Sequence, residues 1–342
     1  MYAKSLFSLD SYHISEELGF ILPDPLEELP PYYQPWMDIA LQIPELVHSH
    51  ELRSHINKMP LLSSQFLQKH RELRLAHLAL SMMTMGYVWQ EGENNTVEML
   101  PHNLAVPFWE VSQRLGLPPI LTHADAVLAN WRKKDPEGNL ELLFSLPGED
   151  SVRGFFMVTL LVEVAAVPAL RNIPTVINGV RCGDTEGVAR ALENISQSIQ
   201  DMTDALKLMH GAFLTRMRNY MPPAHKQLIQ DISLQPSLKI FVQQQASEQL
   251  NQAFEHCVTK LLALRNYHIN VVSRYITVPA VRARQLRSQS QDSEGEMVSR
   301  APTALEERGT GGSGIMTFLK TVRDQTKEAL LPDESKEVKH PS

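Results

Sequence analysis

The sequence predicts an all-α fold, and two features of its apolar pattern lead to that prediction. Apolar residues recur at i, i+3/i+4 and i+7 along most of the 342-residue chain, which is the spacing of helices with one buried face. No segment shows the alternation of a strand–turn–strand unit. The clearest helix carries a seven-residue repeat of about three heptads, which a bundle explains more simply than a coiled-coil dimer. The repeat consists of Val188, Leu192, Ile195, Ile199, Met202, Leu206 and Met209.

Other helices are expected in chain order after a proline-rich, extended lead-in. The first is expected at about 35–50 and a stronger one at about 64–87, whose methionine-rich end is typical of flexible core packing. The stretch 155–167 is apolar nearly all round, so a helix buried in a large core is expected there. A C-terminal helix is expected to begin near Ile315.

Two polar stretches, at 132–138 and 146–150, mark a change of composition. We expect a domain boundary there, with a small helical N-terminal domain at 1–147 and a larger helical bundle at 148–342. The segment at about 280–313 is poor in large apolar groups and is expected to form a long surface loop. Residues 332–342 are expected to form a flexible tail.

Composition indicates the compartment and excludes some partners. The net charge of −7 argues against a nucleic-acid-binding surface. Two cysteines, Cys182 and Cys257, are too few for a disulfide framework and indicate a reducing compartment. The longest apolar run, 155–170, is interrupted by Glu163 and Pro168 and is short for a bilayer. We therefore expect a cytoplasmic monomer that binds neither membranes nor nucleic acid.

His268 stands out because it occupies a core position of a predicted long helix. It continues a series of apolar positions at Leu250, Phe254, Cys257, Leu261, Leu264, Val271 and Tyr275. A polar ring on such a face has two nitrogens to satisfy. Spacing leaves two interpretations open: a core histidine hydrogen-bonded to an ordinary partner, or a metal ligand.

Several motifs in this chain occur in the order found in one enzyme family. They include 264–268 (LRNYH), 221–225 (MPPAH) and 308–312 (RGTGG), and others are 118–121 (PPIL), 127–131 (VLANW), 154–156 (GFF), 11–14 (SYHI), 19–20 (GF) and 87–89 (YVW). Together they cover almost the whole chain, which resembles the indoleamine 2,3-dioxygenases. His123 and Thr159 resemble the second paralogue of that family more than the first.

The resemblance implies an enzyme containing heme b that opens the indole ring of L-tryptophan, or of related indoleamines, with O2 to give N-formylkynurenine. By match to the family motif, His268 is the proximal ligand of the heme iron, a role that suits a neutral imidazole. Arg265 matches a position near a heme propionate. A solvated helix charge is the alternative for Arg265.

The resemblance also implies a substrate pocket. Phe155 is expected to stack near the indole, with Thr159 one turn further along the helix and His123 and Val127 at the pocket wall. For Thr159 the alternative is a hydrogen bond to a carbonyl one turn earlier, and for His123 a surface or capping position. The glycine-rich loop Gly309, Thr310, Gly311 and Gly312 resembles a mobile loop that closes over substrate, or is an ordinary loop.

The chain departs from the family after His210. The family continues there with a segment of several tens of residues, whereas His210 here runs almost directly into a stretch that matches the far side of that segment. In the family, the segment supplies the arginine that pairs with the substrate carboxylate. The resemblance therefore implies impaired activity in this shortened chain. The alternative is a non-catalytic, immune-related signalling or scaffold protein.

Overall fold

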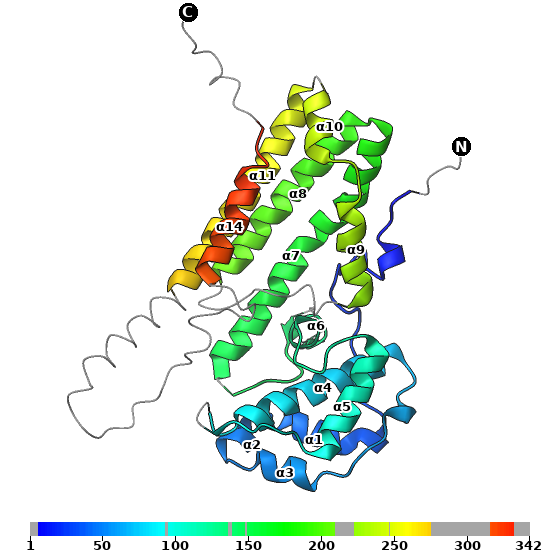
Figure 1. The fold of residues 1–342 in the computed structure, drawn as a ribbon, viewed down its shortest axis with the longest axis vertical. Helices are drawn as coiled ribbons and strands as arrows, with labels where there is room; N and C mark the ends of the chain where they lie inside the picture. The colour runs from blue at the N-terminus through cyan, green and yellow to red at the C-terminus, as the bar shows by residue number, and fades with distance from the viewer. Residues whose placement is uncertain are drawn as a thin grey trace, which may run out of the picture.

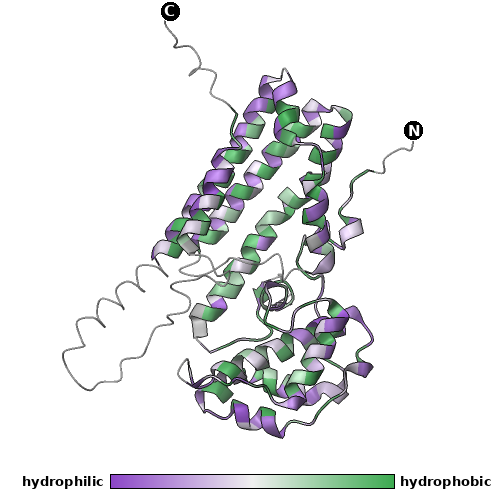
Figure 2. Cartoon of the chain, viewed as in Figure 1, coloured by the Kyte–Doolittle hydropathy of each residue, from purple (hydrophilic) through white to green (hydrophobic). Residues whose placement is uncertain are grey.

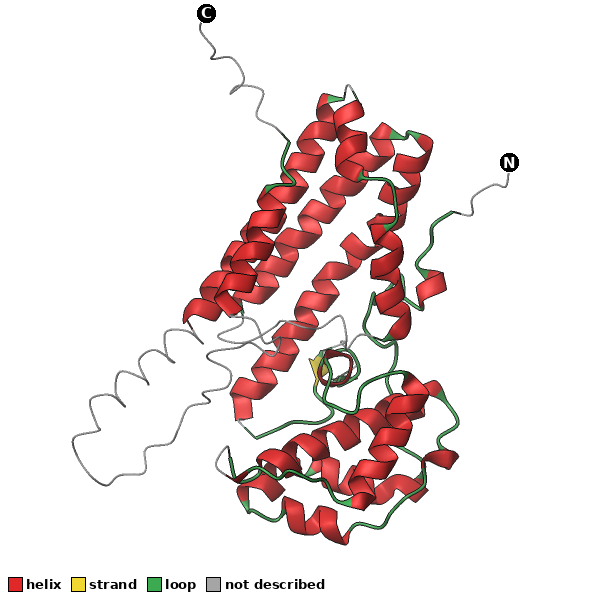
Figure 3. Cartoon of the chain, in the orientation of Figure 1, coloured by secondary structure: helices red, strands yellow, loops and turns green. Residues whose placement is uncertain are grey.

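The computed structural model describes residues 6–92, 95–135, 139–147, 149–208, 222–245, 247–274 and 315–331. In this part of the chain the fold is all-α, which confirms the predicted class (Figure 3). Its strands form one antiparallel hairpin, in which Arg132 pairs with Glu141. Its first strand, β1, lies within the first of the two polar stretches expected at the domain boundary, 132–138.

Figure 1 labels the elements, which follow one another along the chain with these bounds. They are η1 Asp10–Tyr12, η2 Pro31–Tyr33, α1 Gln34–Leu41, α2 Ile43–His48, α3 Leu52–Lys58, η3 Ser64–Phe66, α4 His70–Trp89, α5 His102–Leu115, α6 His123–Ala126, β1 Arg132–Lys133, β2 Leu140–Glu141, α7 Glu149–Cys182, α8 Thr185–Lys207, α9 Pro223–Ser233, α10 Leu238–Gln244, α11 Glu248–Val272 and α14 Ile315–Lys327.

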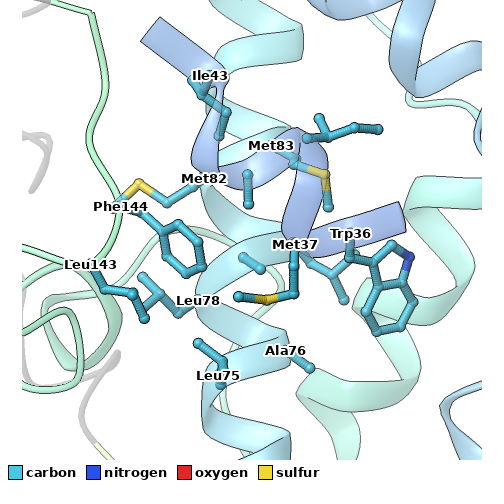
Figure 4. Close-up of a cluster of buried hydrophobic side chains, with 14 of the residues drawn as sticks. Trp36, Met37, Ile43, Leu75, Ala76, Leu78, Met82, Met83, Leu143 and Phe144 are labelled. Carbon is cyan, nitrogen blue, oxygen red and sulfur yellow. The ribbon is translucent and has the colours of Figure 1, made fainter. Parts of the chain in front are cut away.

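The helices α1 to α6 surround an apolar core of their own. Trp36 of α1 and Met82 and Met83 of α4 lie at its centre, fully buried (Figure 4). The expected core role of the methionine-rich end of α4 is therefore confirmed for these two residues. The helix expected at about 35–50 is two helices, α1 and α2, because Pro44 has no N–H and suits the first turn of a new helix.

The longest helix, α7, runs antiparallel to α8, and one serine joins the two. Pro168 lies inside α7 and interrupts its hydrogen-bond ladder. The Ser198 hydroxyl of α8 accepts from the Ala169 N–H at 3.2 Å and donates to the Ala165 carbonyl at 2.6 Å. This hydroxyl thus links an N–H and a carbonyl of α7 that lie four residues apart, next to the proline. In this way α8 helps α7 to continue as a helix past Pro168.

The expectation that 155–167 is buried on all sides is wrong. Leu161 is 37% exposed and Val164 is 41% exposed, because α7 is packed mainly along the side that faces α8. Figure 2 shows how apolar α7 is along its length. Among the described residues, Val152–Cys182 is also the one stretch long and apolar enough to cross a membrane, a test that core helices of soluble proteins pass too.

The other long helices complete the bundle. α8 packs against both α7 and α11, and α14 packs along α11 (Figure 1). The seven-residue repeat therefore serves packing within the chain, as expected, and α14 begins at the expected Ile315. The expected loop at 280–313 and the tail at 332–342 lie outside the described residues.

The division into domains at 147 and 148 stays a prediction. Phe7 and Ile14, from the N-terminal part, pack with Leu170 and Ile177 of α7 and Leu228 of α9. The first turns of α7, in turn, join the core of α1 to α6. Each predicted domain thus contributes side chains to an apolar core of the other.

Candidate active site

His268 lies near the C-terminal end of α11. This helix begins at a serine cap, where the Ser247 hydroxyl accepts from the Leu250 N–H at 3.3 Å. The His268 ring is half-buried and makes no hydrogen bond to another described residue. Burial lowers its pKa, so the imidazole is neutral at pH 7. A neutral ring whose nitrogens bond to no other described residue can ligate a metal through its lone pair.

Arg265, one turn before His268, ties α11 to α14. Its guanidinium donates to the Val322 carbonyl at 2.6 Å and also contacts the Thr326 hydroxyl. Burial lowers the pKa of Arg265. The structure therefore gives the guanidinium a role in helix packing, in place of the solvated helix charge considered as the alternative. Its expected place near a propionate stays a prediction.

The expected pocket residues of α7 lie on one face, four residues apart. Phe155 is half-buried, and its ring centroid lies 5.6 Å from that of Phe156. Thr159 is buried, and its hydroxyl donates to the Phe155 carbonyl at 2.7 Å, which is the local bond considered as an alternative for it. One further turn along, Glu163 occupies the same face.

The short helix α6 brings a second set of residues against α7. Its N-cap Thr122 and Asp125 form a capping box, which fixes the start of the helix at His123. His123 Nε2 lies 2.9 Å from Glu163 Oε1. Val127 is buried in the core that the first turns of α7 complete.

Glu163 is the residue of this wall that sequence reasoning missed. In the sequence, Glu163 stands out only as an interruption of the apolar run at 155–170. A lone carboxylate in such a run, at helical spacing from Thr159, is the signal that could have identified it. Its histidine partner lies 40 positions earlier in the chain, and no local pattern connects the two.

The structure thus groups His123, Phe155 and Thr159 with Glu163 on one side and places His268 and Arg265 on another helix. The ends of α7 and α11 that carry these residues both point towards the end of the bundle that faces α1 to α6 (Figure 1). The glycine-rich residues Gly309, Thr310, Gly311 and Gly312 lie outside the described residues. In the described ranges, no three His, Cys, Asp or Glu side chains gather as a metal site.

Comparison with known proteins identifies a family whose sequence model matches this chain. The sequence model of the family described as indoleamine 2,3-dioxygenase matches residues 8–212 and 209–329. The two matched pieces meet at 209–212, which is the point expected for the missing segment. The junction itself lies outside the described residues.

Individual relatives match over nearly their whole length. The chain is 42% identical to indoleamine 2,3-dioxygenase 2 of Homo sapiens over 396 aligned positions, which cover 95% of this chain and 96% of the relative. It is 37% identical to indoleamine 2,3-dioxygenase 1 of Rattus norvegicus, with 94% and 96% covered. A protein named myoglobin from Haliotis madaka is 31% identical, with 94% and 98% covered.

These alignments also show how much shorter this chain is than its relatives and which of the two paralogues it resembles more. The alignment with the human protein has 396 positions and this chain has 342 residues, so at least 54 positions (396 − 342) face no residue of this chain. Identity is higher to the relatives named 2 than to those named 1, as the resemblance indicates. With both pieces of the family model matched, the chain belongs to the indoleamine 2,3-dioxygenase family.

Proposed function

We propose that this protein is a heme-dependent dioxygenase that cleaves the 2,3 bond of the indole ring of L-tryptophan with O2, giving N-formylkynurenine. We further propose that the shortened chain does so with reduced activity. The observation that carries the proposal is His268, a neutral, half-buried imidazole with no hydrogen bond to another described residue, in a chain of this family.

The residues around His268 fit a heme b. A single imidazole apart from other ligating side chains suits a metal that brings its own equatorial ligands, as heme iron does. Arg265, one helical turn away, adds a cationic group beside that position. When bound, the heme would supply the iron centre that activates O2.

The chain's own residues would bind and orient the substrate. The Phe155 ring offers an aromatic face for stacking against an indole. The Thr159 hydroxyl uses its proton on the Phe155 carbonyl, so its oxygen keeps lone pairs that can accept from an indole N–H. The bond from His123 to Glu163 holds α6 against α7 and fixes this wall in position.

The reduced activity follows from the missing segment. The family's arginine for the substrate carboxylate lies in that segment, and no residue of this chain matches it. Losing one such charged contact costs on the order of 2–5 kcal/mol of binding free energy. We therefore expect a strongly raised KM for tryptophan before any effect on heme retention.

The second candidate is a non-catalytic, immune-related signalling or scaffold protein. The observation that favours it is the same gap of at least 54 positions. A second observation is that a relative 31% identical to this chain is named myoglobin and not dioxygenase. For either function, we propose a cytoplasmic monomer that acts without membrane or nucleic acid.

The test is an absorbance spectrum and a kynurenine assay on the full chain after reconstitution with heme. We expect a Soret band and slow N-formylkynurenine formation. His268→Ala should lose the band. His256→Ala should keep it, because His256 lies on the same helix but is exposed and paired with Glu193 at 3.0 Å. A folded, heme-free protein would support the scaffold instead, and an unchanged spectrum in His268→Ala would overturn the ligand assignment.

A further inference from the structure

A cavity of about 640 Å³ has a lining that shares no residue with the candidate active site. The loop that carries His13 and Phe20, the start of α4, the end of α5 and the start of α9 enclose it. At the end of α5, Gly116 adopts a φ of +65°, and a Cβ there would meet the Pro223 ring at 2.8 Å. Glycine therefore allows α9 to approach closely enough to close this side of the cavity.

A buried guanidinium forms one end of the cavity. Arg74 is 5% exposed, and its Nη2 donates to the Ala124 carbonyl at 2.5 Å. Its Nε is buried and has no hydrogen-bond partner among the described residues. A buried cation with an unused donor is costly unless an anion or acceptor completes it.

His225 adds a second unused nitrogen from the opposite element. Its ring is 8% exposed and lies against the Phe20 ring with centroids 4.8 Å apart, and its Nδ1 is buried without a partner among the described residues. Two exposed histidines, His13 and His70, also line the cavity. Burial first, and then the charge of Arg74, lower the pKa of His225 to about 4.

The nearby carboxylates are already engaged. Asp125 lies 2.8 Å from His77 Nδ1 and accepts from Thr122, and Glu163 pairs with His123. Neither carboxylate lines the cavity, and no Asp or Glu is among the described residues that do. Asp125 is close enough for its charge to act on Arg74, but its hydrogen bonds go to His77 and Thr122. The described residues of the cavity lining therefore supply no acceptor for the unused Arg74 Nε.

The rest of the lining is apolar. Phe20, Ile21, Leu22, Leu115 and Leu117 form its walls. A volume of this size is typical of sites for small organic molecules, which combine apolar walls with a few convergent polar groups.

We propose that this cavity binds a small organic anion, namely a carboxylate on a compact apolar body. The carboxylate lies at the end of the cavity that Arg74 and His225 line and accepts hydrogen bonds from their N–H groups, and the apolar body lies against the walls formed by Phe20 and Leu117. This site is independent of the heme and of the proposed dioxygenase function.

The test measures binding of 2-naphthoate to the full chain by isothermal titration calorimetry, with 2-naphthalenemethanol as the uncharged counterpart of equal shape. We expect naphthoate to bind at least about tenfold more tightly than the alcohol, the effect of one charge-assisted hydrogen bond. His225→Phe keeps the ring against Phe20 but removes Nδ1, so it should weaken naphthoate binding about tenfold and leave the alcohol unchanged. His256→Phe, remote from the cavity, is the control for a histidine substitution.

A pH series provides a second readout that does not depend on any variant. A bound carboxylate favours the protonated form of the histidines it faces, so affinity for naphthoate should rise as the pH falls from 7.5 to about 5.5. The groups that face the ligand are Arg74, His13, His70 and His225, with Glu163 close enough to raise the pKa of His225. Equal affinity for acid and alcohol, no binding of naphthoate, or a pH-independent affinity would each overturn the proposal.

Discussion

Replacing Ser198 by alanine should destabilise the protein far more than its small change in volume suggests. The hydroxyl is 1% exposed and bridges the Ala169 N–H and the Ala165 carbonyl beside Pro168. Ser198→Ala removes both hydrogen bonds and leaves two backbone groups of α7 without their partner. At roughly 1 kcal/mol for each bond, the free energy of unfolding should fall by about 2 kcal/mol.

Ser196 provides a matched control two residues away on the same helix. It is 0% exposed, and its hydroxyl has no hydrogen-bond partner among the described residues. Ser196→Ala removes a desolvated polar group that gains nothing, so the free energy of unfolding should stay the same or rise slightly. Urea denaturation followed by far-UV circular dichroism measures both variants, with the midpoint compared at unchanged slope. Equal losses in the two variants would refute the bridging role of Ser198.

Three further substitutions test the electrostatics and capping of the fold. Asp125→Ala should lower the free energy of unfolding by about 3–5 kcal/mol, because it leaves the charge of Arg74 and the polar ring of His77 buried without their carboxylate. Urea titration measures this change, and a loss below about 1 kcal/mol would contradict it. The pKa of His225 falls from 6.5 to about 4 on folding, so the unfolded chain takes up a proton that the folded one does not, and stability should decline by up to roughly 3 kcal/mol as the pH drops through that window. His225→Phe should flatten that decline in denaturation midpoints measured from pH 7 to 4, and an unchanged profile would count against it. Asp184→Ala, which removes the N-cap of α8, should cost about 1 kcal/mol, whereas Asp184→Asn should retain most of the stability.

The class of fold follows from the sequence because helical spacing is a local property. The repeat from Val188 to Leu206 became α8, and Ile315 begins α14 as expected. The break at Gln42 and the exposure of Leu161 were not predictable in the same way. The first depends on where Pro44 falls within a turn, and the second on which helices pack against α7.

Within the candidate site, a residue can be picked out from the sequence where one motif carries one role. His268 stands out by its place in a core series and by its motif, and its role as a metal ligand stays a prediction. The pairing of His123 with Glu163 was missed because it joins two elements far apart in the chain. Arg74 and His225, which line the same end of the cavity, were missed for the same reason: each looks like an ordinary helix residue until the fold places both on one cavity.

The position of α8 explains why heme retention and tryptophan affinity should fail separately. On one side, Ser198 fixes α8 to α7, which carries Phe155. On the other, Gln200 accepts from Lys260 of α11 at 3.0 Å, and α11 carries His268. The helix α8, which this chain retains, therefore helps to set the spacing between Phe155 and His268. Under the proposed function, loss of the segment should raise the KM for tryptophan while His268 stays in place, whereas loss of the Ser198 bridge should disturb heme retention and tryptophan affinity together.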